Sequence, residues 1–242
     1  MPELLIDNTW FIAAAALFVG AWVQTSVGFG LAVVSAPIIV VVSPLWVPIV
    51  LTMSALWLSA VNTWDQRRHL NAKAMAVPMI TRLPGTVIGV WLLTQMSITA
   101  LQIIVSSMVL LAVIVTYWAP HYPANRLNLG IAGAISGLTG ATTAIGGPPM
   151  AIVMQHGDPR ETRANLSLYF TYSCIVSLIG YYWAGLLHLE LLVESMSFAP
   201  IILIGYFIGV KTRYLIDAKR FRSILMFLCL IAGVSALIGA LW

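Results

Sequence analysis

Charge is scarce in this sequence of 242 residues: 8% of them are Asp, Glu, Lys or Arg, whereas 60% are hydrophobic. About a quarter of the residues of a soluble domain are charged, and a domain of this length cannot hide so much apolar side chain from water. The composition therefore excludes a soluble protein and indicates an integral membrane protein. The length suits a single membrane domain over residues 1–242 and leaves no room for a separate soluble module.

Signatures of catalysis and metal binding are also missing. The sequence has no His-x-x-x-His pair, Gly-x-Ser-x-Gly elbow, Walker loop or Cys-x-x-Cys, and its histidines lie far apart at segment ends. Cys174 and Cys229 both fall inside apolar runs, which favours buried packing over a disulfide or a metal pair. Residues 1–10 contain no Lys or Arg, unlike a cleavable signal peptide. We therefore expect no enzyme activity, no cofactor and no metal.

Long apolar runs are what the sequence does have. A helix needs about 20 residues to cross ~30 Å of hydrocarbon, and the runs 31–42 and 147–156 are too short for this. Each follows a glycine-containing break, so we predict two broken or re-entrant hairpins, 9–42 and 128–156. The expected fold is an all-α integral membrane protein with these hairpins plus about six full spans. The apolar runs are 9–27, 31–42, 46–64, 74–94, 99–118, 128–145, 147–156, 164–184, 189–210 and 222–241.

The positions of the cations predict an orientation. Lys and Arg gather in the loops around 67–73, 126, 160–163 and 211–222, and the positive-inside rule makes these loops cytoplasmic. This requires each hairpin to begin and end on the same side, and it places both termini in the periplasm of a bacterial inner membrane. Because the net charge of +4 reflects this topology, we expect no nucleic-acid partner.

The first half of the chain, 1–120, resembles the second half, 128–242. Each starts with a hairpin and continues with three spanning segments, and an odd number of crossings inverts one half relative to the other. Inverted repeats with broken helices recur in secondary transporters, which bind substrate near the midplane. The matching positions are Pro44 with Pro159, His69-Leu70 with His188-Leu189, and Gly85-x-x-x-Gly89 with Gly205-x-x-x-Gly209.

The two hairpin breaks form the first candidate binding site. Glycines allow sharp turns and close approach of a ligand, and a helix that begins after a break offers N–H groups and a positive dipole end to an anion. Pro148 and Pro149 suit a first helical turn. The alternative is close helix packing, in which each Ser or Thr bonds to its own helix. The candidate residues are Gln24, Ser26, Gly28, Gly30, Thr139, Gly140, Thr142, Thr143, Gly146 and Gly147.

Arg82 is the second candidate, because it lies near the middle of the apolar run 74–94. A charge at that depth is costly and marks a solute path. Its guanidinium can hold a sulfonate, a sulfite or a carboxylate through two parallel hydrogen bonds. The adjacent Pro84 and Gly85 are expected to unwind the helix locally. The alternative is that Arg82 caps carbonyl groups at a break or extends toward the membrane surface.

Other polar residues are candidates for gating or coupling. Arg163 lies close to Asn165 at the cytoplasmic edge, and it is either a gate or a charge that only sets the topology. Glu190 and Glu194 are one helical turn apart, and they are either a proton-coupling pair or a pair at the membrane interface. No carboxylate lies at a predicted midplane, so the coupling ion stays open, with a proton as one candidate. The gating or coupling candidates are Asn62, Arg163, Asn165, Glu190 and Glu194.

Two motifs carry a resemblance to a known family. The run Gly20-x-x-x-Gln24-Thr25-Ser26-Val27-Gly28-Phe29-Gly30, with Pro37 beyond it, resembles the first repeat motif of the sulfite exporter TauE/SafE family, also called the toluene sulfonate uptake permease family. Gly133-x-x-x-Gly137-Leu138-Thr139-Gly140 with Gly146-Gly147-Pro148-Pro149 resembles its second motif, and Leu83-Pro84-Gly85-x-x-x-Gly89 also fits. Phe29 stands where many members are richer in glycine.

The resemblance covers essentially the whole chain. It implies a bacterial inner-membrane permease for small organosulfur anions such as sulfite, sulfoacetate or aryl sulfonates. We expect alternating access, with one inverted half rocking against the other around the anion. The expected partners are the anion and the lipid bilayer, and the protein is compatible with a homo-oligomer. A passive anion channel or pore and a non-transporting membrane assembly protein are the alternatives.

Overall fold

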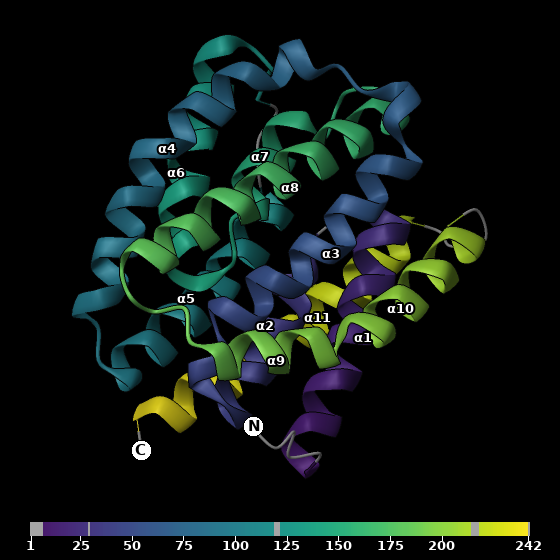
Figure 1. Cartoon of the computed structure of the whole chain (residues 1–242). Coiled ribbons are helices and arrows are strands. Elements are labelled where there is room, and N and C mark those ends of the chain that lie inside the picture. The colour runs from purple at the N-terminus through teal and green to yellow at the C-terminus, as the bar shows by residue number, and fades with distance from the viewer. Residues whose placement is uncertain (1–6, 29, 119–121, 214–217, 242) are drawn as a thin grey trace.

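The computed structural model of the chain describes residues 7–28, 30–118, 122–213 and 218–241. Within these ranges it contains helices and no strand, which confirms the all-α prediction (Figure 1). The α-helices are α1 (Asn8–Val27), α2 (Leu31–Val42), α3 (Ile49–Asp65), α4 (Ala72–Gln95), α5 (Ile98–Trp118), α6 (Arg126–Thr143), α7 (Gly147–Met154), α8 (Pro159–Trp183), α9 (Leu189–Ser197), α10 (Ala199–Thr212) and α11 (Ala218–Leu241). Two short 3-10 helices, Pro44–Trp46 and Arg67–His69, precede α3 and α4.

The helices follow the apolar runs closely, with two differences. The run 189–210 forms two helices that meet at Phe198, because Pro200 in the first turn of α10 has no N–H to donate to the preceding turn. The unwinding expected at Pro84 is absent, since α4 continues through both Pro78 and Pro84. Packing of α4 along α6 supports the helix where the proline removes a hydrogen bond.

Four helical segments in the described ranges are long and apolar enough to cross a membrane: Asn8–Ser26, Ala72–Gln95, Ile98–Val115 and Leu189–Thr212. The protein is therefore membrane-embedded. Helices α3 and α8 do not meet this criterion, because α3 has 17 residues and the sequence of α8 is rich in polar residues such as Asn165 and Ser173. These two helices pack against each other. The prediction of about six full spans thus stays a prediction.

Each predicted break separates two helices that pack against each other, α1 with α2 and α6 with α7. The first break follows Gly28, whose φ of 80° is left-handed and whose N–H bonds to the carbonyl of Gln24. The hydroxyl of Ser35 on α2 then donates to the carbonyl oxygen of Ala16 on α1 at 2.8 Å. The second break follows Ala144, which takes the same conformation with a φ of 61°. A non-glycine residue in this region stores strain, as is common at functional sites.

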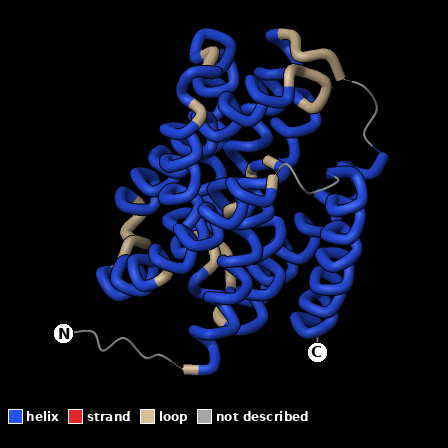
Figure 2. The backbone as a smooth tube through the Cα atoms, turned by 90° about the vertical axis from the view of Figure 1, so that its right-hand side faces the viewer, coloured by secondary structure: helices blue, strands red, loops and turns tan. Residues whose placement is uncertain are grey.

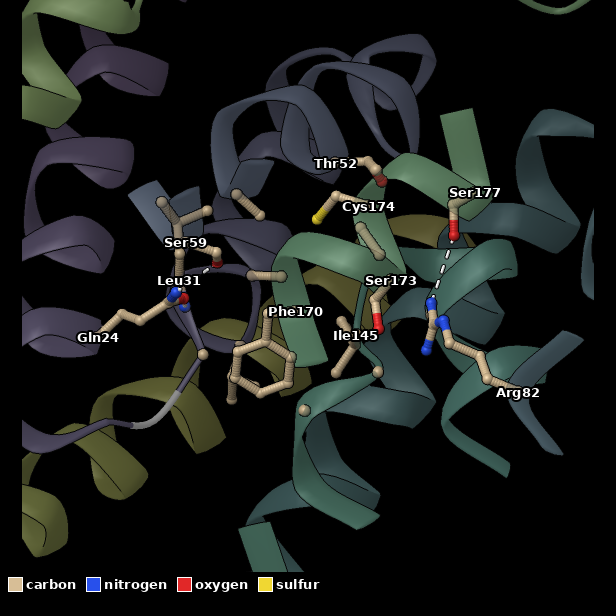
Figure 3. Close-up of a pocket in the computed structure, with 18 residues that line it drawn as sticks. Gln24, Leu31, Thr52, Ser59, Arg82, Ile145, Phe170, Ser173, Cys174 and Ser177 are labelled. Carbon is tan, nitrogen blue, oxygen red and sulfur yellow. Dashed lines mark hydrogen bonds between the residues drawn. The ribbon is translucent and has the colours of Figure 1, made fainter. Parts of the chain in front are cut away.

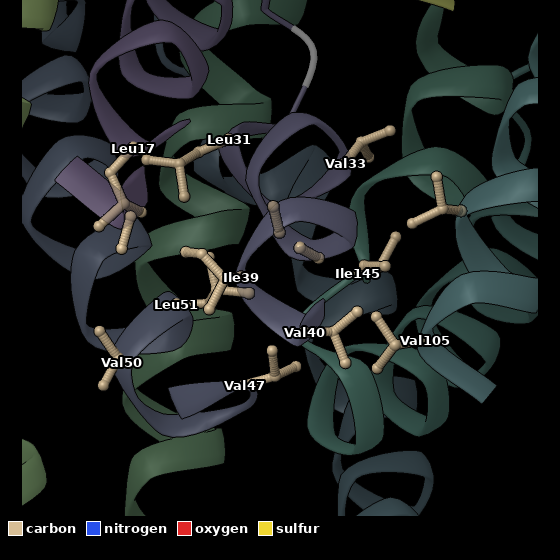
Figure 4. Close-up of a cluster of buried hydrophobic side chains, with 14 of the residues drawn as sticks. Leu17, Leu31, Val33, Ile39, Val40, Val47, Val50, Leu51, Val105 and Ile145 are labelled. Atoms are coloured by element: carbon tan, nitrogen blue, oxygen red, sulfur yellow. The ribbon is translucent and has the colours of Figure 1, made fainter. Parts of the chain in front are cut away.

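The helices do not group by halves of the chain. One group, which we call the α6 unit, consists of α4, α6, α7 and α8, whose buried side chains share one apolar cluster (Figure 1). Helix α8 of this unit packs against α3 of the other unit. The other, the α2 unit, consists of α1, α2, α3, α5, α9, α10 and α11, and Figure 2 shows the backbone from a second side. The apolar core of the α2 unit surrounds Leu31, Ile39 and Leu51 (Figure 4). The two halves of the chain therefore interlock, because α4 belongs with α6 and α10 with α1.

The glycine pairs that match between the halves have equivalent positions. Gly85 and Gly89 bring α4 against the backbone of α6 at Ala134 and Leu138. Gly205 and Gly209 likewise bring α10 against the backbone of α1 at Phe18 and Trp22. Small residues allow helix backbones to approach closely inside membranes. In both halves the fourth segment thus crosses the first helix of the other half.

Helix α8 begins at a carboxylate that lies outside the apolar segments. The N–H groups of Glu161 and Arg160 donate to Asp158 at 3.0 and 2.9 Å and hold the pKa of Asp158 below its ordinary value of 3.8. A lowered pKa contributes stability above the unfolded-state pKa, and this stability is lost as the pH falls through the folded-state pKa.

Asp158→Ala should therefore lower the unfolding temperature in detergent at pH 7. The difference from wild type should shrink below about pH 4, and Asp158→Asn, which retains a cap, should unfold near wild type. Equal unfolding temperatures for wild type and Asp158→Ala at pH 7 would refute this role.

Candidate functional site

A cavity lies where the two hairpin breaks face each other across the two units (Figure 3). It offers about 50 Å³ to the centres of water-sized molecules, whereas one water needs roughly 10–15 Å³. A small anion, or a few waters, therefore fits without rearrangement. Its walls are Gln24, Gly30, Leu31, Ala32, Val33, Thr52, Ala55 and Ser59 of the α2 unit, and Arg82, Gly140, Ala144, Ile145, Gly146, Gly147, Phe170, Ser173, Cys174 and Ser177 of the α6 unit and its break.

Arg82 reaches this cavity from α4 and is only 3% exposed. Its Nη1 donates to the carbonyl oxygen and hydroxyl of Ser136 at 2.8 and 2.9 Å, and its Nη2 donates to Ser177 Oγ at 3.3 Å. The ring of Tyr169 lies 5.6 Å from the guanidinium carbon. Gly140 leaves room for the guanidinium, since a Cβ there would lie 2.9 Å from Nη2. The guanidinium is thus held in one position at the second break.

No described carboxylate compensates the charge of Arg82. None of the described carboxylates forms an ion pair with it, and within the described structure its Nε is buried with no hydrogen-bond partner. A buried cation without a counter-ion is costly, and an anion that enters the cavity removes that cost. The electrostatics of this cavity therefore favour a negatively charged occupant.

The side of the cavity formed by the first break is polar but uncharged. Gln24 Oε1 accepts from the N–H of Leu31 at 2.6 Å, and Gln24 Nε2 donates to Ser59 Oγ at 3.1 Å. The N–H of Leu31 at the start of α2, which we expected to be free for an anion, therefore donates to a side chain of the protein instead. At the second break Pro148 and Pro149 occupy the first turn of α7, as expected, and remove two more N–H groups. Helix N-termini thus supply fewer donors than the sequence suggested.

Ser173 is a cavity residue that the sequence analysis did not single out. It is 5% exposed, and its hydroxyl has no hydrogen-bond partner in the part of the chain that the structure describes. Figure 3 shows it on the same side of the cavity as Ser177 and Arg82. The signal was a series of polar residues at every fourth position of α8: Tyr169, Ser173, Ser177 and Tyr181. Residues at this spacing share one face of a helix.

Several predicted hydroxyl donors lie outside the cavity. Each donates to a carbonyl of its own helix: Ser26 to Trp22, Thr139 to Ile135, Thr142 to Leu138 and Thr143 to Thr139, at 2.6–3.0 Å. Gly28 also lies outside it, and Phe29 lies outside the described residues. From the predicted set, the cavity therefore brings together Arg82, Gln24, Gly30, Gly140, Gly146 and Gly147.

The gating and coupling candidates do not line the cavity. The stem of Arg163 lies beside Gly28, where a Cβ would approach it to 3.1 Å, so Arg163 sits at the first break. Asn62 donates to Leu58 O and Thr25 Oγ1, and Asn165 accepts from the N–H of Asn71. Glu190 is exposed on α9, and Glu194 is half-buried one turn further along.

The hydroxyl of Ser173 provides a test of the cavity. Ser173→Ala should weaken anion binding about fivefold, the effect of one neutral hydrogen bond of ~1 kcal/mol. Ser106→Ala is the matched control, because Ser106 is equally buried but donates to Gln102 O on α5 away from the cavity. Equilibrium binding of radiolabelled sulfite to both purified variants measures the difference. Equal affinities in the two variants would remove Ser173 from the site.

A membrane-embedded helical protein that encloses a positively charged cavity between two broken helices has the features of a solute transporter. A model of the sulfite exporter TauE/SafE family matches residues 12–236. The chain belongs to this family, whose members are transporters and not enzymes.

A relative from Cupriavidus necator supports this assignment. It is described as a probable sulfite/organosulfonate exporter TauE and is 26% identical over 212 residues, which cover 81% of this chain and 80% of the relative. No solved structure matches the chain significantly.

Proposed function

We propose that the protein is a secondary transporter that moves small organosulfur anions, such as sulfite, sulfoacetate or other sulfonates, across a bacterial inner membrane. The charge of buried Arg82 carries the proposal, since no described carboxylate pairs with it and it lies in the cavity between the breaks. The hydroxyl of Ser173, which has no hydrogen-bond partner among the described residues, adds a neutral donor beside it. Sulfite and sulfonates present several oxygen acceptors to such donors. The printed name of the Cupriavidus necator relative supports the same class of substrate.

Alternating access requires two bodies that move around the bound anion. The α6 unit and the α2 unit are the bodies that we assign to this motion, because the cavity lies between them. We therefore propose that the two units, and not the two halves of the chain, rock against each other, since α4 and α10 each pack with the opposite half. The interlocked pattern supports an inverted repeat of 1–120 and 128–242, because each half contributes an equivalent crossing.

The membrane topology stays a proposal built on the loop charges. Each hairpin would return to the side of the membrane on which it begins, with the basic loops in the cytoplasm and both termini in the periplasm. Single cysteines at Ser97 and at Arg126 should then react with an impermeant reagent from opposite sides of the membrane. Reaction from the same side would refute the topology.

Transport in proteoliposomes tests the function itself. Sulfite should accumulate inside against its gradient when a proton or sodium gradient is imposed, and should equilibrate when the gradient is collapsed. Flux that stays linear and never exceeds equilibrium under any gradient would indicate an anion channel instead. A folded protein that gives neither flux nor binding would indicate a non-transporting assembly protein.

A further inference from the structure

A second and larger cavity lies in the seam between α5 of the α2 unit and the α6–α7 hairpin. It offers about 420 Å³ to the centres of water-sized molecules. Ile145 lines both this seam and the anion cavity (Figures 3 and 4). The lining residues are Met108, Leu111, Ala112, Val115, Tyr122, Asn128, Ile131, Ala132, Ile135, Thr139, Ile145, Pro148, Pro149, Ile152 and Val153.

The lining is apolar along its length and polar at one end. From Asn128 to Thr139 the α6 wall extends roughly 16 Å at 1.5 Å per residue. Thr139 adds little polarity, because its hydroxyl donates to Ile135 O. Tyr122 and Asn128 mark the polar end, and exposed Arg126 lies beside them at the start of α6. The seam thus has the shape and polarity of a slot for an amphiphile with an anionic head.

The surroundings of the seam indicate where the amphiphile comes from. The lining residues Leu111, Ile131 and Ile135 are 49%, 50% and 46% exposed, so the seam opens on the outer surface of the helices. An apolar cavity does not hold water, and in a membrane-embedded protein the medium at this surface is lipid hydrocarbon. Basic residues near a membrane surface attract anionic lipid head groups.

We propose that this seam binds one acyl chain of an anionic phospholipid of the surrounding bilayer, with the head group at Arg126 and Tyr122. The chain would extend along α6 toward Ile145 and fill the space between the two units. The site is separate from the anion cavity and does not depend on what that cavity transports. The exposed face of α11 around Phe227, Leu228 and Ile231 offers a comparison, since it faces outward without lining the seam.

Photocrosslinking in vesicles tests the site. The full chain is reconstituted in phosphatidylethanolamine with phosphatidylglycerol that has a diazirine on its acyl chain, and labelled peptides are mapped by mass spectrometry. Label should be several-fold higher on 108–115 and 131–135 than on 227–231. Leu111→Trp, which fills the mouth, should remove the excess, and Leu228→Trp should not. Ile131→Trp on the opposite wall serves if Leu111→Trp does not fold.

The other outcomes overturn the proposal. Equal labelling of the seam and of the α11 face would indicate ordinary contact with the bilayer. Protection of both walls together with intermolecular crosslinks between α5 and α6 would indicate a second copy of the chain. Displacement of the label by an alkyl sulfonate added at the concentration that saturates sulfite binding would assign the seam to the tail of a transported anion.

Discussion

Arg82→Gln should abolish transport and weaken sulfite binding by at least about 30-fold, because removing one partner of a buried charge pair costs roughly 2–5 kcal/mol. Glutamine keeps a donor for Ser136 or Ser177 but loses the positive charge, which no described carboxylate compensates. Without a bound anion, the Arg82→Gln protein should be no less stable than the wild type, since it no longer buries a cation without a counter-ion. Equilibrium binding and thermal unfolding in detergent measure the two effects.

Arg82→Lys is the matched control for charge without the planar guanidinium. Lysine places a single ammonium group in the cavity and cannot hold two oxygens through parallel hydrogen bonds. Its affinity for sulfite should therefore lie between those of the wild type and Arg82→Gln. Wild-type affinity in a folded Arg82→Gln protein would contradict the assignment of the site.

Gly85→Ala should lower the stability of the protein by about 1–3 kcal/mol, the usual cost of forcing an extra carbon into a packed contact. A Cβ at Gly85 would overlap the carbonyl oxygen of Ala134 on α6 and approach the N–H of Leu138 to 3.0 Å. Both atoms belong to the α6 backbone, so no side chain can rotate away. Denaturant or thermal unfolding of the purified protein measures the loss.

Gly130→Ala is the control at the same helix crossing. Its Cβ would meet Thr81 Cγ2 and Val77 Cγ1 at 3.6 Å, which is ordinary contact. Since alanine favours a helix over glycine by up to ~1 kcal/mol, Gly130→Ala should be neutral or stabilising. Loss of stability in Gly130→Ala, or none in Gly85→Ala, would show that backbone contact at Gly85 does not hold α4 against α6.

Most of the α-helices followed from the sequence, because all of them except α9 and α10, which share the run 189–210, correspond to one apolar run each. The two short helices α2 and α7 were predictable from run length and from the glycines before them. The break between α9 and α10 was missed, since Ser197 and Phe198 leave the apolar run continuous. The interlocking of the halves was also missed, because a glycine pair indicates close packing but does not name the partner helix.

The site was less predictable than the fold. Arg82 stands out because a charge in an apolar run has few explanations. The hydroxyls of Ser26, Thr139, Thr142 and Thr143 looked equally promising, but a Ser or Thr in a helix can satisfy itself on the preceding turn, and composition does not distinguish the two cases. Ser173 could not be singled out from the sequence in this way, since only the packing of α8 shows that its hydroxyl has no hydrogen-bond partner among the described residues.

Protection of Cys174 is the measurement that tests the central claim most directly. Its side chain lines the cavity with Arg82 and Ser173 (Figure 3), whereas the thiol of Cys229 donates to Val33 O in the α2 unit. A protein with Cys229→Ala and Cys174 retained should react with a small thiol reagent, and methanesulfonate, which does not consume the reagent, should slow the reaction. The same anion should give no protection in the Arg82→Gln background. An unchanged rate of Cys174 labelling at a saturating anion concentration would place the bound anion elsewhere and contradict the account.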